Sequence, residues 1–217
     1  TTTGSIRLLF AELAPAVSEI VARRSQEPPV HEPVGNYPIE EQRKLGQMVA
    51  HSVGFCFESG RLDVSTHPFC SGIAPGDCRL TTRYKPTGFV ESFFGVLHEV
   101  GHGLYEQGLP RELAGTPLGQ AASLGIHESQ SRLWENQIGR SRAFWTFWLP
   151  VVRTFFPGPL RDAGLDSFLQ TLHVAKPGFI RVDADEVTYP LHILLRYRLE
   201  RAILGGDLAL ADLPGAW

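Results

Sequence analysis

The stretch His98-Glu99-Val100-Gly101-His102 carries two imidazoles and a carboxylate within five consecutive residues. Positions i and i+4 of a helix lie one above the other, so His98 and His102 share a face and can hold one metal ion. Glu99 follows the first of these ligands, where its carboxylate can take a proton from metal-bound water. The stretch therefore predicts a catalytic zinc site with Glu99 as its base.

The residues around this stretch have the spacing of an amphipathic helix. We expect this helix over about residues 88–107, ended by Gly108 and Pro110. Gly101 and Gly103 each weaken a helix by about 1 kcal/mol relative to alanine, so we expect another backbone to approach closely there. The alternative is that both histidines are ordinary residues that happen to share a face. The apolar positions of the helix are Phe93, Phe94, Val96, Leu97, Val100 and Leu104.

A catalytic zinc ion usually takes three protein ligands and leaves one position for water. A histidine ten residues after His98 would indicate another metalloprotease branch, but Gly108 stands there. We favour Glu128 as the third ligand, because the interval from His102 allows a helix end, a loop and an antiparallel helix. The carboxylates considered for this position are Glu106, Glu112, Glu128 and Glu135.

The polar segment around Glu128 has two interpretations. His127 and Gln130 can orient the metal ligands through hydrogen bonds. Alternatively, the segment is a solvated helix face on which Arg132 forms ion pairs with Glu128 and Glu135.

The remaining pattern is mainly helical with a small sheet, in one domain over residues 1–217. Alternation over residues 78–84 predicts a strand, and the turn-rich residues 65–76 precede it. Pro28, Pro29 and Pro33 predict a loop. Helical spacing also predicts helices at about residues 5–24, 39–57, 121–148 and 183–204.

The composition excludes several classes of partner. A net charge of −3 with mixed signs is not that of a nucleic-acid-binding protein. No segment has the 18 or so apolar residues of a membrane span, and the first residues have no signal-peptide pattern. We interpret the three cysteines, Cys56, Cys70 and Cys78, as reduced packing residues, which is typical of a cytoplasmic protein.

Five blocks occur in order along the chain: His67-Pro68-Phe69, Asp77-Cys78-Arg79-Leu80-Thr81, His98 to His102, His127-Glu128-Ser129-Gln130 and Ile180-Arg181-Val182-Asp183-Ala184-Asp185. In these blocks the chain resembles the carboxypeptidase Taq family of zinc metallocarboxypeptidases. The resemblance implies a zincin-like helical metallopeptidase core with a small β-sheet. It also implies that His98, His102 and Glu128 bind Zn²⁺, for which Co²⁺ can substitute.

The resemblance further implies a carboxypeptidase that hydrolyses the C-terminal peptide bond of peptides, with Glu99 activating zinc-bound water. Such an enzyme must recognise a free carboxylate, which a guanidinium does bidentately. Arg79 and Arg181 take this role by resemblance. The alternative for each is a structural ion pair, with Asp77 and Asp185 respectively.

The last predicted helix adds one candidate. Asp185, Thr188, His192 and Arg196 fall on one of its faces, which either lines a cleft or meets solvent. His192, or Tyr189 beside it, is a candidate to stabilise the oxyanion that develops on the substrate carbonyl. A structural histidine with satisfied hydrogen bonds is the alternative.

The chain departs from the family in length, since it lacks the family's N-terminal and C-terminal extensions. We therefore expect a shortened member or a fragment without part of the substrate groove; whether it forms a homodimer stays open. The alternative function is a shortened, weakly active or inactive zinc-binding scaffold. A third interpretation is an endopeptidase whose groove is open at both ends.

Overall fold

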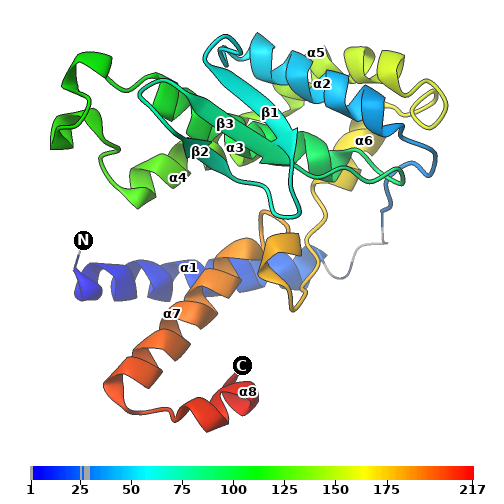
Figure 1. The fold of residues 1–217 in the computed structure, drawn as a ribbon. Helices are drawn as coiled ribbons and strands as arrows, with labels where there is room; N and C mark the ends of the chain where they lie inside the picture. The colour runs from blue at the N-terminus through cyan, green and yellow to red at the C-terminus, as the bar shows by residue number, and fades with distance from the viewer. Residues whose placement is uncertain (1, 25, 27–29) are drawn as a thin grey trace. The chain divides into compact units, whose positions relative to one another are not determined.

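The computed structural model describes residues 2–24, 26 and 30–217, which excludes the predicted loop residues Pro28 and Pro29. Over this part of the chain it contains eight α-helices and one three-stranded sheet (Figure 1). The mainly α class with a small sheet is therefore confirmed. The chain packs as a central unit, His31–Leu172, and a terminal unit formed by Thr1–Val30 and His173–Trp217. A single domain stays a prediction.

The sheet of the central unit has the order β1-β3-β2. It consists of β1 (Gly60–Val64), β2 (Cys70–Gly72) and β3 (Cys78–Thr82). β3 pairs in parallel with β1 and antiparallel with β2. Sequence alternation predicted only β3. β2 has three residues, too few to show a repeat, whereas β1 was missed although it is as long as β3.

Five helices belong to the central unit: α2 (Ile39–Ser52), α3 (Val90–Gln107), α4 (Leu124–Arg132), α5 (Arg142–Phe155) and α6 (Leu165–Leu172). α3 matches its predicted range closely. α2 ends earlier than predicted, and Gly54 follows with a positive φ of 105° that suits glycine.

The long helix predicted over residues 121–148 is interrupted. After α4 the chain forms a π-helical segment, Leu133–Ile138, and then turns before α5. Ser141 starts the new helix, because its hydroxyl accepts a hydrogen bond from the backbone N–H of Phe144. α5 continues through Pro150 beyond the predicted end.

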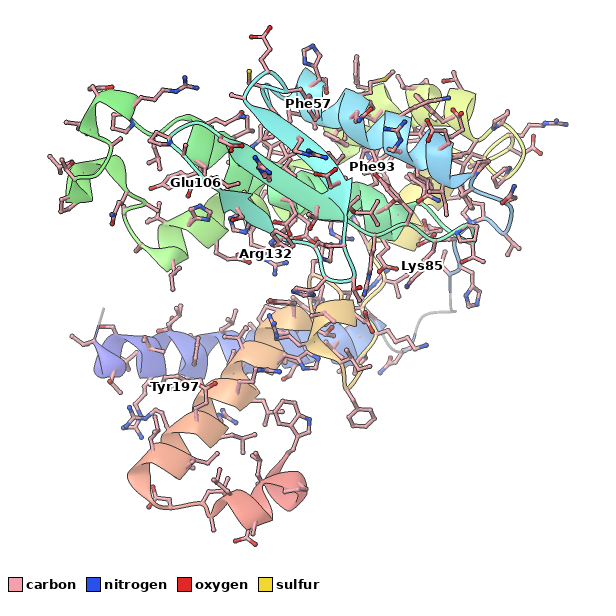
Figure 2. All side chains as sticks on the ribbon, viewed as in Figure 1. Phe57, Lys85, Phe93, Glu106, Arg132 and Tyr197 are labelled. Carbon is pink, nitrogen blue, oxygen red and sulfur yellow. The ribbon has the colours of Figure 1, made fainter. Side chains whose placement is uncertain are left out.

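The core of the central unit is aromatic and centres on α3. Phe93, labelled in Figure 2, packs at 5.2 Å between ring centroids against Trp145 of α5. The indole N–H of Trp145 donates to the carbonyl of Gly139 at 2.7 Å. Leu97 and Val100 of α3 are fully buried. These contacts hold α3 rigidly, so side chains on its other face have defined positions.

The terminal unit pairs α1 (Thr3–Arg24) with α7 (Tyr189–Gly205), and α8 (Leu213–Ala216) follows them. Phe10 and Tyr197 meet edge to face, with centroids 5.1 Å apart. α7 begins later than predicted, because the carboxylate of Asp185 accepts hydrogen bonds from the backbone N–H groups of Val187 and Thr188 and forms a turn. Among the described helices, none is both long and apolar enough to cross a bilayer.

Candidate metal centre

The three predicted ligands come together in the central unit. His98 and His102 lie on one face of α3, with ring centroids 4.9 Å apart. Oε2 of Glu128, on α4, lies 3.3 Å from Nε2 of His102 and 3.9 Å from Nε2 of His98. The three residues thus offer ligand atoms that all lie within 4.8 Å of one another.

Gly101 allows α4 to approach α3 this closely. A Cβ at this position would lie 2.5 Å from the carbonyl oxygen of Gln130 and from Cα of Ser131. Only glycine avoids that overlap, so the expected backbone contact is confirmed at Gly101. At Gly103 the close neighbours are instead the side chains of Phe55 and Leu80.

His98 is held from its outer side by Glu135. Its Nδ1 lies 2.7 Å from Oε2 of Glu135, and Arg132 donates to the same oxygen at 2.9 Å. Burial alone would raise the pKa of Glu135, but His98 and Arg132 outweigh it and lower this pKa. Burial likewise opposes a charged His98, yet Glu135 raises its pKa above the usual value. Glu135 lies in the π-helical segment, a distortion often found at functional sites.

His102 is held from its outer side by a second chain of contacts. Its Nδ1 lies 2.6 Å from Nδ1 of His127, and Nε2 of His127 lies 2.7 Å from Glu106. Glu106, which Figure 2 labels, accepts a hydrogen bond from the Nε2–H group of His127, so Nδ1 of His127 accepts one from the Nδ1–H group of His102. When a metal ion is bound, Nε2 of His102 can therefore give it a lone pair in place of its hydrogen bond to Glu128, and the Glu135 contact allows Nε2 of His98 to do the same.

Glu128 completes the donor set as an ionised carboxylate. Its Oε1 accepts a hydrogen bond from Nε of Arg132 at 3.0 Å. Burial raises its pKa, but the hydrogen bond with His102 and the charges of His98 and Arg132 outweigh this and lower the pKa to about 2. Two imidazole nitrogens and one carboxylate oxygen form a donor set typical of catalytic zinc. A tetrahedral zinc ion separates its ligand atoms by about 3.4 Å, so the observed 3.3 and 3.9 Å fit a divalent ion.

Glu99 lies beside this cluster and is only 5% exposed. Burial is the main cause that raises the pKa of its carboxyl group above the usual value, while His98 and His102 act in the opposite direction. A carboxyl group in this position can exchange a proton more readily near neutral pH than an exposed glutamate can.

Arg79 lies on β3 and forms an ion pair with Asp77, with Nη2 and Oδ2 3.2 Å apart. Strand alternation directs its side chain away from the face on which the buried Cys78 and Leu80 meet α3. The ion pair is the alternative that the sequence left open. Binding of a substrate carboxylate by Arg79 stays a prediction.

Arg181 and His192 belong to the terminal unit. The guanidinium of Arg181 donates to the hydroxyl of Tyr189, and His192 is buried in α7. Asp185, the other partner considered for Arg181, accepts hydrogen bonds within its own turn. The roles of Arg181 and His192 in substrate binding and catalysis stay predictions.

Sequence reasoning found part of the surrounding hydrogen-bond network. The predicted hydrogen bond of His127 to a candidate ligand is present, since His127 contacts His102, whereas Gln130 donates to its neighbour Ser129. Glu106 and Glu135 were considered only as ligands or surface ion pairs. Nothing in their spacing indicates which histidine each contacts, because the pairing depends on how α4 and the π-helical segment pack on α3.

The sequence is similar to those of known carboxypeptidases. A sequence model of the family described as Carboxypeptidase Taq (M32) metallopeptidase matches residues 1–217. Thermostable carboxypeptidase 1 of Thermus thermophilus is 47% identical over 215 residues, which cover 96% of this chain and 41% of that protein. Carboxypeptidase 1 of Bacillus subtilis is 42% identical over 212 residues, covering 96% and 42%.

Solved structures show the same likeness. An M32 carboxypeptidase from Deinococcus radiodurans superposes with a TM-score of 0.94 at 39% identity, covering 100% of this chain and 44% of that one. Metallocarboxypeptidase 1 of Trypanosoma cruzi gives a TM-score of 0.93 at 37% identity with the same coverage. The chain therefore spans less than half the length of the relatives it matches.

Proposed function

Because the chain belongs to the carboxypeptidase Taq (M32) metallopeptidase family, we propose that it hydrolyses the C-terminal peptide bond of peptides at a zinc site formed by His98, His102 and Glu128. The observation that carries this proposal is the convergence of two imidazole Nε2 atoms on one oxygen of Glu128. Co²⁺ has similar ligand preferences and would occupy the same donors.

When bound, a divalent ion supplies the positive charge that polarises a peptide carbonyl and lowers the pKa of water. Glu99 accepts a proton from the attacking water on a carboxylate oxygen and then returns it to the nitrogen of the leaving amine. Its raised pKa suits both transfers, since it lies closer to neutral pH. Arg132 donates a hydrogen bond to Glu128, while Glu135 and His127 keep the two ring planes in place.

Recognition of the substrate's free carboxylate is assigned to Arg79 and Arg181, whose guanidinium groups can bind it bidentately. His192 is proposed to stabilise the developing oxyanion. The substrates on this proposal are peptides with a free C-terminal carboxylate.

A second function is a zinc-binding scaffold with weak or absent catalysis. The observation that favours it is length, since the chain covers only 41% and 42% of the Thermus and Bacillus relatives. The three candidate ligands lie within the central unit, so on this proposal metal binding does not require the residues that those relatives have in addition.

A peptide assay separates these functions. The purified chain is incubated with one peptide as its free acid and as its C-terminal amide, with and without a chelator, and zinc content is measured. We expect one zinc ion per chain and release of single residues from the free acid alone. The chelator should abolish release, and added zinc should restore it.

The Glu99→Gln variant provides the control. We expect turnover to fall by about 10²–10⁴-fold while zinc content stays unchanged. Stoichiometric zinc without amino-acid release would establish the scaffold instead. Internal cleavage of both peptides would indicate an endopeptidase, and absence of zinc would refute both proposals.

A further inference from the structure

Two cysteines on neighbouring strands lie in contact. Sγ of Cys70 on β2 is 3.3 Å from Sγ of Cys78 on β3, and both thiols are free. The strand register places Cys70 opposite Leu80 and Cys78 opposite Gly72. Both thiols therefore point to the same face of the sheet, and Gly72 has no side chain to separate them.

The two thiols differ in access to solvent. Cys78 is fully buried, whereas Cys70, on the outer strand of the sheet, is half-buried. Their face of the sheet packs on α3. The hydrogen bond with Cys78 and burial raise the pKa of the Cys70 thiol, and Glu99 and Glu106 of α3 add to this. The pair thus lies where β2 and β3 pack on α3, the helix that carries His98 and His102.

We propose that Cys70 and Cys78 are a redox-active dithiol that a hydroperoxide converts into an intrachain disulfide joining β2 to β3. The two sulfur atoms are 3.3 Å apart and must approach to about 2.05 Å. β2 has only three residues and pairs on one side only, so a small adjustment of Cys70 suffices. This inference concerns residues outside the metal cluster and does not depend on peptidase activity.

The reaction balances with hydrogen peroxide as the oxidant. The sulfur of Cys70, which is the more accessible, attacks a peroxide oxygen and the O–O bond breaks. The departing hydroxide takes up the thiol proton, so that a sulfenic acid and water form. The Cys78 sulfur then attacks the Cys70 sulfur, so that the S–S bond forms and the S–O bond breaks. The departing hydroxide takes up the proton of the Cys78 thiol as water. Two thiols and one peroxide thus yield one disulfide and two waters.

The raised pKa of the Cys70 thiol disfavours its attack on the peroxide, so access to solvent rather than electrostatics selects Cys70 for the first step. Electrostatics favour the second step. The hydrogen bond with Cys70 is the main cause that lowers the pKa of the Cys78 thiol, although burial opposes it. A thiol with a lowered pKa provides more of the thiolate that carries out the second attack.

Peptide mapping tests the proposal without any mutation. Trypsin releases residues 62–79, which contain both Cys70 and Cys78, and separately residues 45–61, which contain Cys56. The purified chain is treated with graded hydrogen peroxide, alkylated with iodoacetamide and digested. We expect peptide 62–79 to lose two hydrogen atoms (about 2 Da) and to resist alkylation until dithiothreitol reduces it.

The exposed Cys56 reports the strength of the treatment, because its peptide gains oxygen as the peroxide dose rises. The proposal predicts that the disulfide forms at doses no higher than those that oxygenate Cys56. It is overturned if peptide 62–79 still takes two alkyl groups at such doses, if it gains oxygen instead, or if Cys56 appears in the disulfide.

Variants show that both sulfurs are required. Cys56→Ser should retain the loss of about 2 Da, whereas Cys70→Ser should abolish it and leave Cys78 open to alkylation after unfolding. Thermal unfolding of each variant shows whether it is folded. If Cys70→Ser does not fold, the wild-type peptide map alone decides the outcome.

Discussion

Each metal-facing imidazole is oriented by a hydrogen bond at its Nδ1. Glu135 provides this bond for His98, and His127 together with Glu106 provides it for His102. The two arrangements differ in charge, because His98 contacts a carboxylate directly while His102 contacts another imidazole. Loss of a negatively charged partner should therefore weaken metal binding more at His98 than at His102.

Replacing Glu135 tests this at the level of one residue. We expect Glu135→Gln to weaken zinc binding by about 10–100-fold, because the amide orients the His98 ring but no longer makes it more basic. Competition with a chromophoric chelator measures the affinity. Glu112→Gln, an exposed position in the short 3₁₀ turn Arg111–Leu113, is the matched control and should leave the affinity unchanged. Equal affinities for both variants would contradict the assigned role.

The crossing of α3 and α4 positions the third candidate ligand, Glu128. The backbone of α4 passes Gly101 with no space for a Cβ, which brings Glu128 to the imidazoles of the neighbouring helix. The backbone packing of α4 on α3 thus determines where Glu128 lies.

A pair of alanine substitutions on α3 tests the crossing. Gly101→Ala should destabilise the fold by about 1–3 kcal/mol through overpacking and should weaken zinc binding, because α4 must move away. Gly95→Ala is the matched control, since its Cβ would meet Thr82 at 3.4 Å; alanine there should be neutral or stabilise by up to about 1 kcal/mol. Urea unfolding and zinc titration measure both effects. If the two variants behaved alike, the close crossing would not explain the glycine.

At the scale of the whole molecule, the aromatic core and the metal cluster share α3 but not its side chains. Phe93 and Leu97 pack in the core, while His98 and His102 lie on the face that meets α4. The apo chain should therefore stay folded, and metal should add stability by joining α3 to α4.

Metal removal tests whether the fold persists without metal and gains stability from it. At a free zinc concentration 100 times the Kd, binding to the native state alone stabilises the fold by about 2.7 kcal/mol. We expect the Tm to fall when a chelator is added and to recover with zinc. In Glu128→Ala this response should be much smaller, because one of three ligands is lost. A Tm that is the same with zinc and with chelator in the wild-type chain would exclude a metal bound at this cluster.

The sequence alone was sufficient for α3, for β3 and for the set His98, His102 and Glu128, because each depends on local spacing or on one short interval along the chain. It failed over residues 121–148, where a cap at Ser141 and a π-helical segment interrupt a continuous apolar pattern. It also missed β1 and β2, which gain their stability from pairing with β3.

Tertiary structure alone decided which carboxylate supports which histidine and which cysteines meet. Glu135 reaches His98 across 37 positions of sequence, and the two thiols touch because a strand pair aligns them beside a glycine. The reason is physical: helix periodicity determines which residues share a face, but distances between faces follow from backbone packing. The sequence thus specified the chemical groups of the metal centre, and the crossing at Gly101 determined that they meet.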